Sequence, residues 1–296
     1  MRLRTGTLAM IKLILGCGYL GRRVADRWRV LGHEVLGVVS HAEHARQIAA
    51  AGILPILADV TEPATLRALP PAETALYCVG YDPAGRKSRR EVYVEGLGNV
   101  LRALAPVTRR IIFISSTGVF GEAGGEWLDE ESPCRPAREA ARALLAAEQQ
   151  LLAHPLGDLA VVLRLAGLYG PGRLPQAVEI RSGRPLTAAE RCWVNLIHVD
   201  DAAAVVVAAE ARARPPRTYL VSDGHPVQRR EYLGRLAELL GAPPPVFCPG
   251  KPASSGRGAG QKRVRNTRML AELGVRLLYP SYREGLAAAV RDGMTG

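Results

Sequence analysis

The 296-residue sequence has few cysteines, few aromatic residues and no long hydrophobic run. Its five cysteines are scattered and form no Cys-x-x-Cys pair or Cys/His cluster, which argues against a disulfide framework and a metal site. No uninterrupted apolar run reaches the roughly 18 residues of a membrane-spanning helix. The N-terminal stretch, interrupted by Lys12, does not have the form of a signal peptide. These absences predict a globular, cytoplasmic protein with no membrane partner.

Lysine is also scarce, because only Lys12, Lys87, Lys251 and Lys262 contribute to the 39 basic residues. The formal net charge of +11 favours anionic partners such as phosphates, nucleotides or nucleic acid. Aromatic residues make up 5% of the chain and do not alternate with the arginines, so the stacking surface of a single-strand nucleic-acid binder is missing. Nucleic acid is therefore the less favoured anionic partner.

The chain does contain a regular alternation of short apolar runs and segments with helical spacing, the latter shown by Leu20, Val24, Trp28 and Leu31. The predicted strands cover residues 11–15, 34–39, 53–58, 75–79, 110–115 and 159–164. The predicted helices cover residues 19–31, 42–51, 63–69, 90–104 and 137–153. Apolar strands separated by helices predict an α/β fold with a doubly wound parallel sheet, the Rossmann architecture.

Glycine and proline become frequent after about residue 168, and strand and helix patterns return at residues 194–212 and 217–222. We predict a Rossmann domain of residues 1–167 plus 196–224 and a smaller C-terminal substrate lobe of residues 168–195 plus 225–296. The stretch 242–261 is so rich in proline, glycine and serine that it predicts a mobile loop.

The first motif with a chemical meaning is Gly16-Cys17-Gly18-Tyr19-Leu20-Gly21, which lies between a predicted strand and a predicted helix. Gly16 permits the tight turn, Gly18 lets the backbone approach a pyrophosphate, and Gly21 lets the helix pack closely on the sheet. The helix would direct free N–H groups at the bound anion. The motif predicts a dinucleotide site.

The end of the second strand distinguishes NADP from NAD, because an acidic residue there binds the 2′-hydroxyl of NAD. This strand ends Val38-Val39-Ser40-His41, without a carboxylate, so we predict NADP in preference to NAD. Arg22 and Ser40 are expected to contact the 2′-phosphate. The remaining residues expected at the dinucleotide are Asp59 and Val60 near the adenine, Val79 and Gly80 under the ribose, and Ser115.

Several motifs in order along nearly the whole chain resemble the extended short-chain dehydrogenase/reductases, the NAD-dependent epimerase/dehydratase group. They are the glycine motif, Asp59, Ser115-Ser116-Thr117-Gly118-Val119-Phe120-Gly121, the stretch from Arg164 to Gly172, and His198-Val199-Asp200-Asp201. The resemblance implies that Ser116 polarises a substrate carbonyl or hydroxyl.

The resemblance also implies a Tyr-x-x-x-Lys pair for acid/base chemistry, but the expected positions hold Ala140 and Leu144, and no such pair occurs elsewhere. The family's asparagine position holds Tyr93. Since an acid/base group is worth about a hundred- to ten-thousand-fold in rate, Tyr93 and Tyr81 are the alternative candidates, with Lys87 or Arg142 as the cation that would lower a phenol pKa.

The sequence therefore favours an NADP-dependent oxidoreductase or epimerase acting on a small hydroxyl or carbonyl substrate, sugar-like substrates included. A non-catalytic NADP-binding sensor or scaffold is the alternative, because the usual catalytic residues are replaced. An RNA-associated basic protein is a third, weaker alternative. The sequence does not fix the oligomeric state, and a homodimer is one of the states left open.

Overall fold

The computed structural model describes residues 10–104, 106–186, 190–248 and 261–293. Within these ranges the chain forms two compact units. The first unit comprises residues 10–115, 146–163 and 206–217, and the second comprises residues 116–145, 164–205 and 218–293. No helix in the described ranges is long and apolar enough to cross a membrane.

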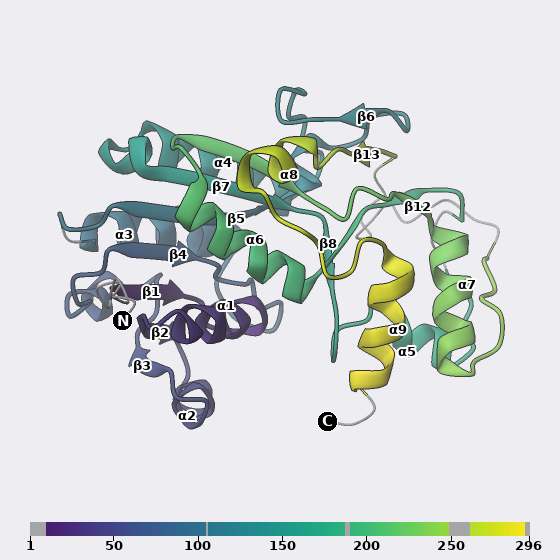
Figure 1. Ribbon diagram of the computed structural model, residues 1–296, viewed down its shortest axis with the longest axis horizontal. Helices are drawn as coiled ribbons and strands as arrows, with labels where there is room; N and C mark the ends of the chain where they lie inside the picture. Colours follow the sequence, from purple (N-terminus) through teal and green to yellow (C-terminus); the bar gives the residue numbers. More distant parts are fainter. Residues whose placement is uncertain (1–9, 105, 187–189, 249–260, 294–296) are drawn as a thin grey trace, which may run out of the picture. The chain divides into compact units, whose positions relative to one another are not determined.

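The central element is a seven-stranded sheet with the order β11-β7-β5-β4-β1-β2-β3 (Figure 1). Its strands are β1 (Ile11–Leu15), β2 (Glu34–Val39), β3 (Leu54–Leu57), β4 (Thr74–Tyr77), β5 (Arg110–Ser116), β7 (Ala160–Leu165) and β11 (Arg217–Val221). Strand β1 pairs in parallel with β2 on one side and with β4 on the other, so the chain reverses its winding direction at β1. The predicted doubly wound α/β fold is confirmed.

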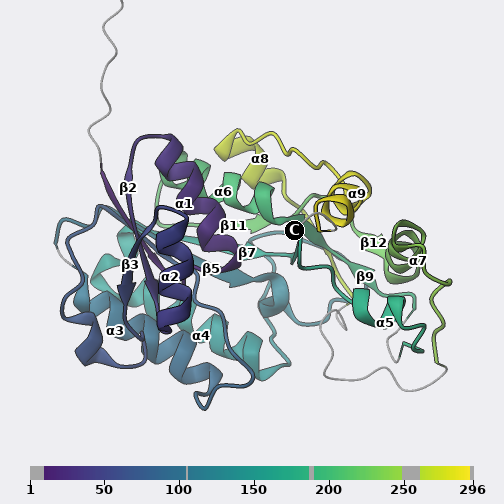
Figure 2. The ribbon, with the colours of Figure 1, turned by 90° about the horizontal axis from the view of Figure 1, so that it is seen from below.

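Helices cover both faces of this sheet, and Figure 2 shows α1 and α3 on opposite faces. The helices that belong wholly to the first unit are α1 (Tyr19–Val30), α2 (Ala42–Ala50) and α3 (Gly96–Ala103). Helix α1 buries Leu20, Val24 and Trp28, as their spacing predicts. The fourth residue of that pattern, Leu31, lies beyond the helix and is 55% exposed.

The predicted helix 90–104 is present, and it begins with a π-helical turn, η2 (Glu91–Glu95), that leads into α3. The hydroxyl of buried Tyr77 donates a hydrogen bond of 2.6 Å to the Val92 carbonyl. The N–H of Gly96 then reaches the Glu91 carbonyl, five residues back. A π turn of this kind widens the helix locally. Tyr77, whose hydrogen bond accompanies the turn, lies on strand β4.

Short connecting turns complete the first unit: η1 (Pro63–Leu66), a 3₁₀ helix, follows β3, and η4 (Pro155–Leu159), also 3₁₀, precedes β7. Two longer helices, α4 (Glu139–Ala153) and α6 (Val199–Arg212), contribute residues to each unit. The predicted loop at 242–261 falls largely on residues 249–260, which lie outside the described ranges.

The second unit contains short strands paired in twos: β10 with β8, β12 with β9, and β13 with β6. These strands are β6 (Trp127–Leu128), β8 (Gly167–Tyr169), β9 (Trp193–Val194), β10 (Leu196–His198), β12 (Val227–Gln228) and β13 (Arg263–Val264). Its helices are η3 (Thr117–Phe120), α5 (Ala177–Arg181), α7 (Arg229–Leu240), α8 (Thr267–Leu273) and α9 (Tyr282–Gly293). Tyr232, Leu233 and Leu286 belong to an apolar core of this unit.

Candidate functional site

The glycine motif lies at the carboxyl end of β1, where the winding direction of the sheet reverses. Gly16 has a φ of +86°, and a Cβ atom on it would lie 2.6 Å from the Val79 Cα. The N–H groups of Gly16 and Cys17 donate to the Val38 carbonyl near the end of β2. The turn is therefore pressed against the ends of both neighbouring strands, and ligands of open α/β sheets bind at this edge.

Gly18 faces open space, unlike the other two motif glycines. It is exposed, and no atom of the described residues lies within 4 Å of the position where its Cβ would be. Gly21, in contrast, would place a Cβ 3.0 Å from the Gly16 carbonyl and from Ile14. This arrangement leaves the backbone at Gly18 accessible to a bulky anion and packs α1 tightly on the sheet.

Helix α1 begins at Tyr19 and carries no acidic residue in its first turn. The positive end of its dipole is therefore not neutralised by its own sequence, and the N–H groups of its first turn are available to an anion that binds there. The residues present thus fit a dinucleotide pyrophosphate at Gly18.

The side chains of the other motif residues contact neighbouring parts of the protein. Cys17 and Leu20 are buried, and burial raises the pKa of the Cys17 thiol to about 12, so this thiol stays protonated. The guanidinium of Arg23 lies 4.5 Å from the ring centre of Tyr19. These side chains support the turn.

The end of β2 presents polar side chains to solvent. Ser40 is exposed, and its Oγ lies 2.9 Å from Nδ1 of His41. The rings of His41 and His44 pack edge to face with centroids 5.8 Å apart. Arg22, in the first turn of α1, is exposed. The sequence predicted Ser40 and Arg22 as cofactor contacts but not the histidines, although His41 directly follows Ser40 at the strand end from which NADP was predicted.

The ends of β3 and β4 supply the next predicted residues. Asp59 accepts hydrogen bonds from the Thr61 N–H and hydroxyl at 2.8 and 2.7 Å, which fixes the turn after β3. The Val60 carbonyl accepts a bond of 2.9 Å from Asn99. Gly80 is exposed, and no described atom lies within 4 Å of its Cβ position. The backbone after β4 is therefore open, as the prediction that a ribose lies against it requires.

Ser115, at the end of β5, is buried, and its hydroxyl donates to the Glu148 carboxylate. Glu148 is itself 98% buried on α4. The side chain of Ser115 therefore joins β5 to α4 within the first unit. With it, all residues predicted to bind the dinucleotide belong to the first unit.

The two tyrosines proposed as acid/base groups, Tyr81 and Tyr93, are both half-buried in the first unit. Tyr81 lies under the guanidinium of Arg89, 4.3 Å from its ring centre. Lys87 instead pairs with Glu62 at 2.6 Å, and this hydrogen bond raises the Lys87 pKa. The cation beside Tyr81 is thus Arg89, which the sequence analysis did not single out.

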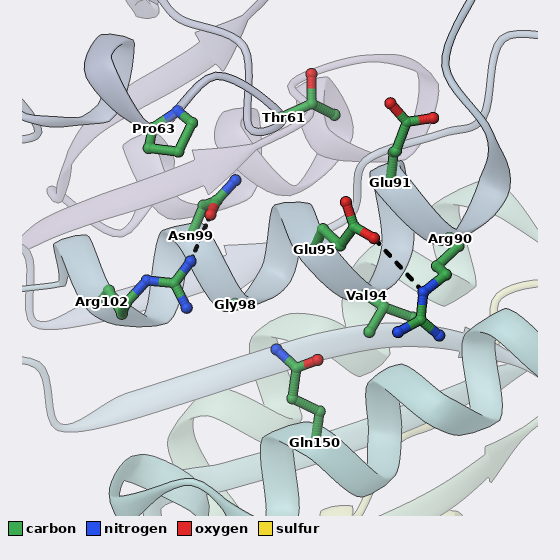
Figure 3. Close-up of a pocket in the computed structure, with 10 residues that line it drawn as sticks. All are labelled: Thr61, Pro63, Arg90, Glu91, Val94, Glu95, Gly98, Asn99, Arg102 and Gln150. Atoms are coloured by element: carbon green, nitrogen blue, oxygen red, sulfur yellow. Dashed lines mark hydrogen bonds and ion pairs between the residues drawn. The ribbon is translucent and has the colours of Figure 1, made fainter.

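Tyr93 belongs to the η2 turn, which together with α3 lines a polar pocket of about 460 Å³ (Figure 3). Within this pocket Arg90 pairs with Glu95, and Arg102 donates to Asn99. None of the predicted site residues lines it. Glu91 accepts a hydrogen bond of 2.7 Å from the Ser88 N–H, so its charged side chains already have protein partners and we assign the pocket no chemistry.

Ser116 belongs to the second unit, where it begins the η3 turn and accepts a hydrogen bond of 3.1 Å from the Gly118 N–H. At the other end of this turn, buried Lys262 donates to the Gly121 carbonyl at 2.9 Å. Burial and the nearby Arg138 lower the pKa of Lys262 to about 8. Sequence reasoning missed Lys262 because nothing in its neighbourhood indicates that this lysine is buried.

The sheet order and the glycine turn define the class of the protein as an NAD-binding Rossmann fold. A model of the NAD dependent epimerase/dehydratase family matches residues 13–222. The chain therefore belongs to this family, within the extended short-chain dehydrogenase/reductases, as the sequence motifs predict.

Individual relatives span nearly the whole chain. The chain is 31% identical over 276 residues to Protein YeeZ of Escherichia coli strain K12, covering 90% of this chain and 95% of that protein. It is 28% identical over 304 residues to a Streptomyces 3-diazoavenalumate denitrifying reductase, covering 91% and 96%. The structure of Thermus thermophilus UDP-glucose 4-epimerase with NAD shares the fold at a TM-score of 0.79 and 22% identity, covering 96% of this chain and 99% of that one.

Proposed function

We propose that the protein is an NADP-dependent oxidoreductase or epimerase that acts on a small hydroxyl or carbonyl compound, sugar-like substrates included. The observation that carries the proposal is the open backbone at Gly18, beside a helix N-terminus without acidic residues and a β2 end without a carboxylate. Such a site favours an additional negative charge on the adenosine ribose.

The bound nicotinamide would supply or accept hydride, and a carbonyl that gains hydride also needs a proton at its oxygen. We assign polarisation of that oxygen to the Ser116 hydroxyl. Tyr93 and Tyr81 are the candidate proton donors in place of the missing Tyr-x-x-x-Lys pair. The Streptomyces relative is named a reductase, which supports hydride chemistry over a purely structural role.

The first test is a fluorescence titration of the purified protein with NADPH and NADH. We expect NADPH to bind more tightly, and Arg22→Ala to weaken NADPH binding by about tenfold or more, because a charged hydrogen bond contributes about 1.5–3 kcal/mol. Arg29→Ala, in the last turn of the same helix, is the matched control and leaves both affinities unchanged. Equal affinities that Arg22→Ala does not alter contradict the NADP assignment.

A second candidate function is a non-catalytic dinucleotide-binding protein, which the replacement of the catalytic pair by Ala140 and Leu144 favours. The two functions differ in their response to Ser116→Ala. For an enzyme, this variant oxidises NADPH with a carbonyl panel about a hundredfold more slowly while its NADPH affinity stays the same. A binding protein shows no oxidation before or after the substitution.

A further inference from the structure

The hydrogen bond between Ser40 and His41 connects the predicted 2′-phosphate contact to an imidazole ring. Ser40 Oγ and His41 Nδ1 are 2.9 Å apart, and both side chains are exposed at the end of β2. A serine hydroxyl has one proton to donate. If that proton is given to His41, it is not available to a ligand.

The direction of this hydrogen bond depends on the proton at Nδ1. A neutral ring protonated at Nε2 accepts the Ser40 proton, and the hydroxyl then presents only lone pairs outward. An imidazolium donates from Nδ1 to Ser40 Oγ. The serine O–H can then donate its hydrogen bond to an anion, and the ring adds a positive charge. Protonation thus converts the pair from a poor to a good partner for a phosphate.

Neighbouring elements also carry charged and titratable side chains. On α2, Glu43 is bound to Arg46, and His44 packs edge to face against His41. Helix α1, which packs on β2, carries Arg22 and Asp26, and both are exposed. Strand β3, which packs against α2, carries no titratable side chain along Leu54–Leu57.

We propose that His41, acting through Ser40, makes the preference for NADP over NAD depend on pH. The inference rests on the proposed function and assigns a specificity role at the same site. His41 is a positioning residue here, because it sets the direction in which Ser40 donates. NAD lacks the 2′-phosphate, so its binding does not use this device.

The test is the ratio of the Kd of NADH to that of NADPH at pH 6.5, 7.5 and 8.5 and constant ionic strength. Histidine changes charge within about pH 5–8, while a phosphate monoester with a second pKa of about 6 stays mostly dianionic in the tested range. We expect the ratio to rise about tenfold from pH 8.5 to pH 6.5, which corresponds to about 1.4 kcal/mol. The Kd of NADH stays constant.

Three variants separate charge from structure. His41→Gln and His41→Arg each give a ratio that does not change with pH, because neither side chain titrates, and the ratio is higher for His41→Arg, which adds a permanent positive charge. His225→Gln, an exposed histidine of the second unit, keeps the wild-type profile.

A NADPH preference that is constant with pH, or a slope that persists in His41→Gln, overturns the inference and leaves the proposed function standing. Failure of the wild-type protein to bind either dinucleotide overturns both.

Discussion

At the scale of single residues, Gly16 and Gly18 stand two positions apart in surroundings of opposite kinds. Gly16→Ala should destabilise the fold by about 2–4 kcal/mol, because its φ is +86° and the new methyl group would overlap Val79. Gly18→Ala meets no described atom, so we expect less than about 1 kcal/mol of destabilisation but a loss of dinucleotide affinity of about tenfold or more. Urea denaturation and NADPH titration of each variant measure the two effects. A Gly18→Ala protein with undiminished affinity contradicts the placement of the pyrophosphate.

The single residues also show what sequence can and cannot reveal. The roles of Gly16, Gly18 and Gly21 follow from motif spacing, because each needs only local backbone geometry. The pairing of Lys87 with Glu62 and the stacking of Arg89 on Tyr81 depend on where a loop folds back. Spacing along the chain does not specify such contacts.

At the scale of elements, a buried ion pair joins the interior strand β1 to helix α6. Lys12 is fully buried and reaches Glu210 at 2.7 Å and Thr74 at 3.1 Å. Lys12→Met should lower the free energy of unfolding by about 3–5 kcal/mol, because it leaves Glu210 largely buried without its cation. Lys12→Met combined with Glu210→Gln should recover much of this loss. A urea double-mutant cycle checks it, and additive effects of the two substitutions contradict a coupled pair.

The strands of the seven-stranded sheet and the helices between them were largely predictable, because most of these strands are short apolar runs and helices such as α1 have a buried stripe. The single lysine inside the first run, Lys12, reads in sequence as an interruption, yet its partner on α6 lets it be buried within β1. The π turn η2 was not predictable, since it accompanies a hydrogen bond from Tyr77, which lies on strand β4. Sequence periodicity reports the buried face of an element and omits such distant partners.

At the scale of the whole molecule, the doubly wound parallel sheet follows from the pattern of apolar runs separated by helices. The dinucleotide site follows as well, since it lies where the winding reverses. The identity of the substrate does not follow from the sequence pattern. In the second unit, two-residue strands such as β9 and β13 carry too little periodicity to be recognised, so the side chains that they bring together stay hidden.

The stability of the molecule as a whole should depend on pH through Asp223. This carboxyl is 3% exposed, and its Oδ2 has no hydrogen-bond partner in the described part of the chain. Burial raises its pKa from 3.8 to about 7, so the folded state binds more protons than the unfolded state between about pH 4 and pH 7. The free energy of unfolding therefore falls as pH rises through this window, and the loss is complete above pH 7.

Asp223→Asn removes this penalty, because the amide carries no charge while its oxygen can still accept the His225 N–H. Relative to the wild type, the variant should gain about 2–4 kcal/mol more stability at pH 8 than at pH 5, since each pKa unit corresponds to about 1.4 kcal/mol. Urea denaturation at the two pH values measures the difference. Asp129→Asn is the control, because this exposed carboxylate accepts the Glu131 N–H in the same local geometry and should give the same effect at both values. If Asp223→Asn also changes stability equally at pH 5 and pH 8, the carboxyl is already ionised in the fold at both, and its burial is compensated by contacts other than those described.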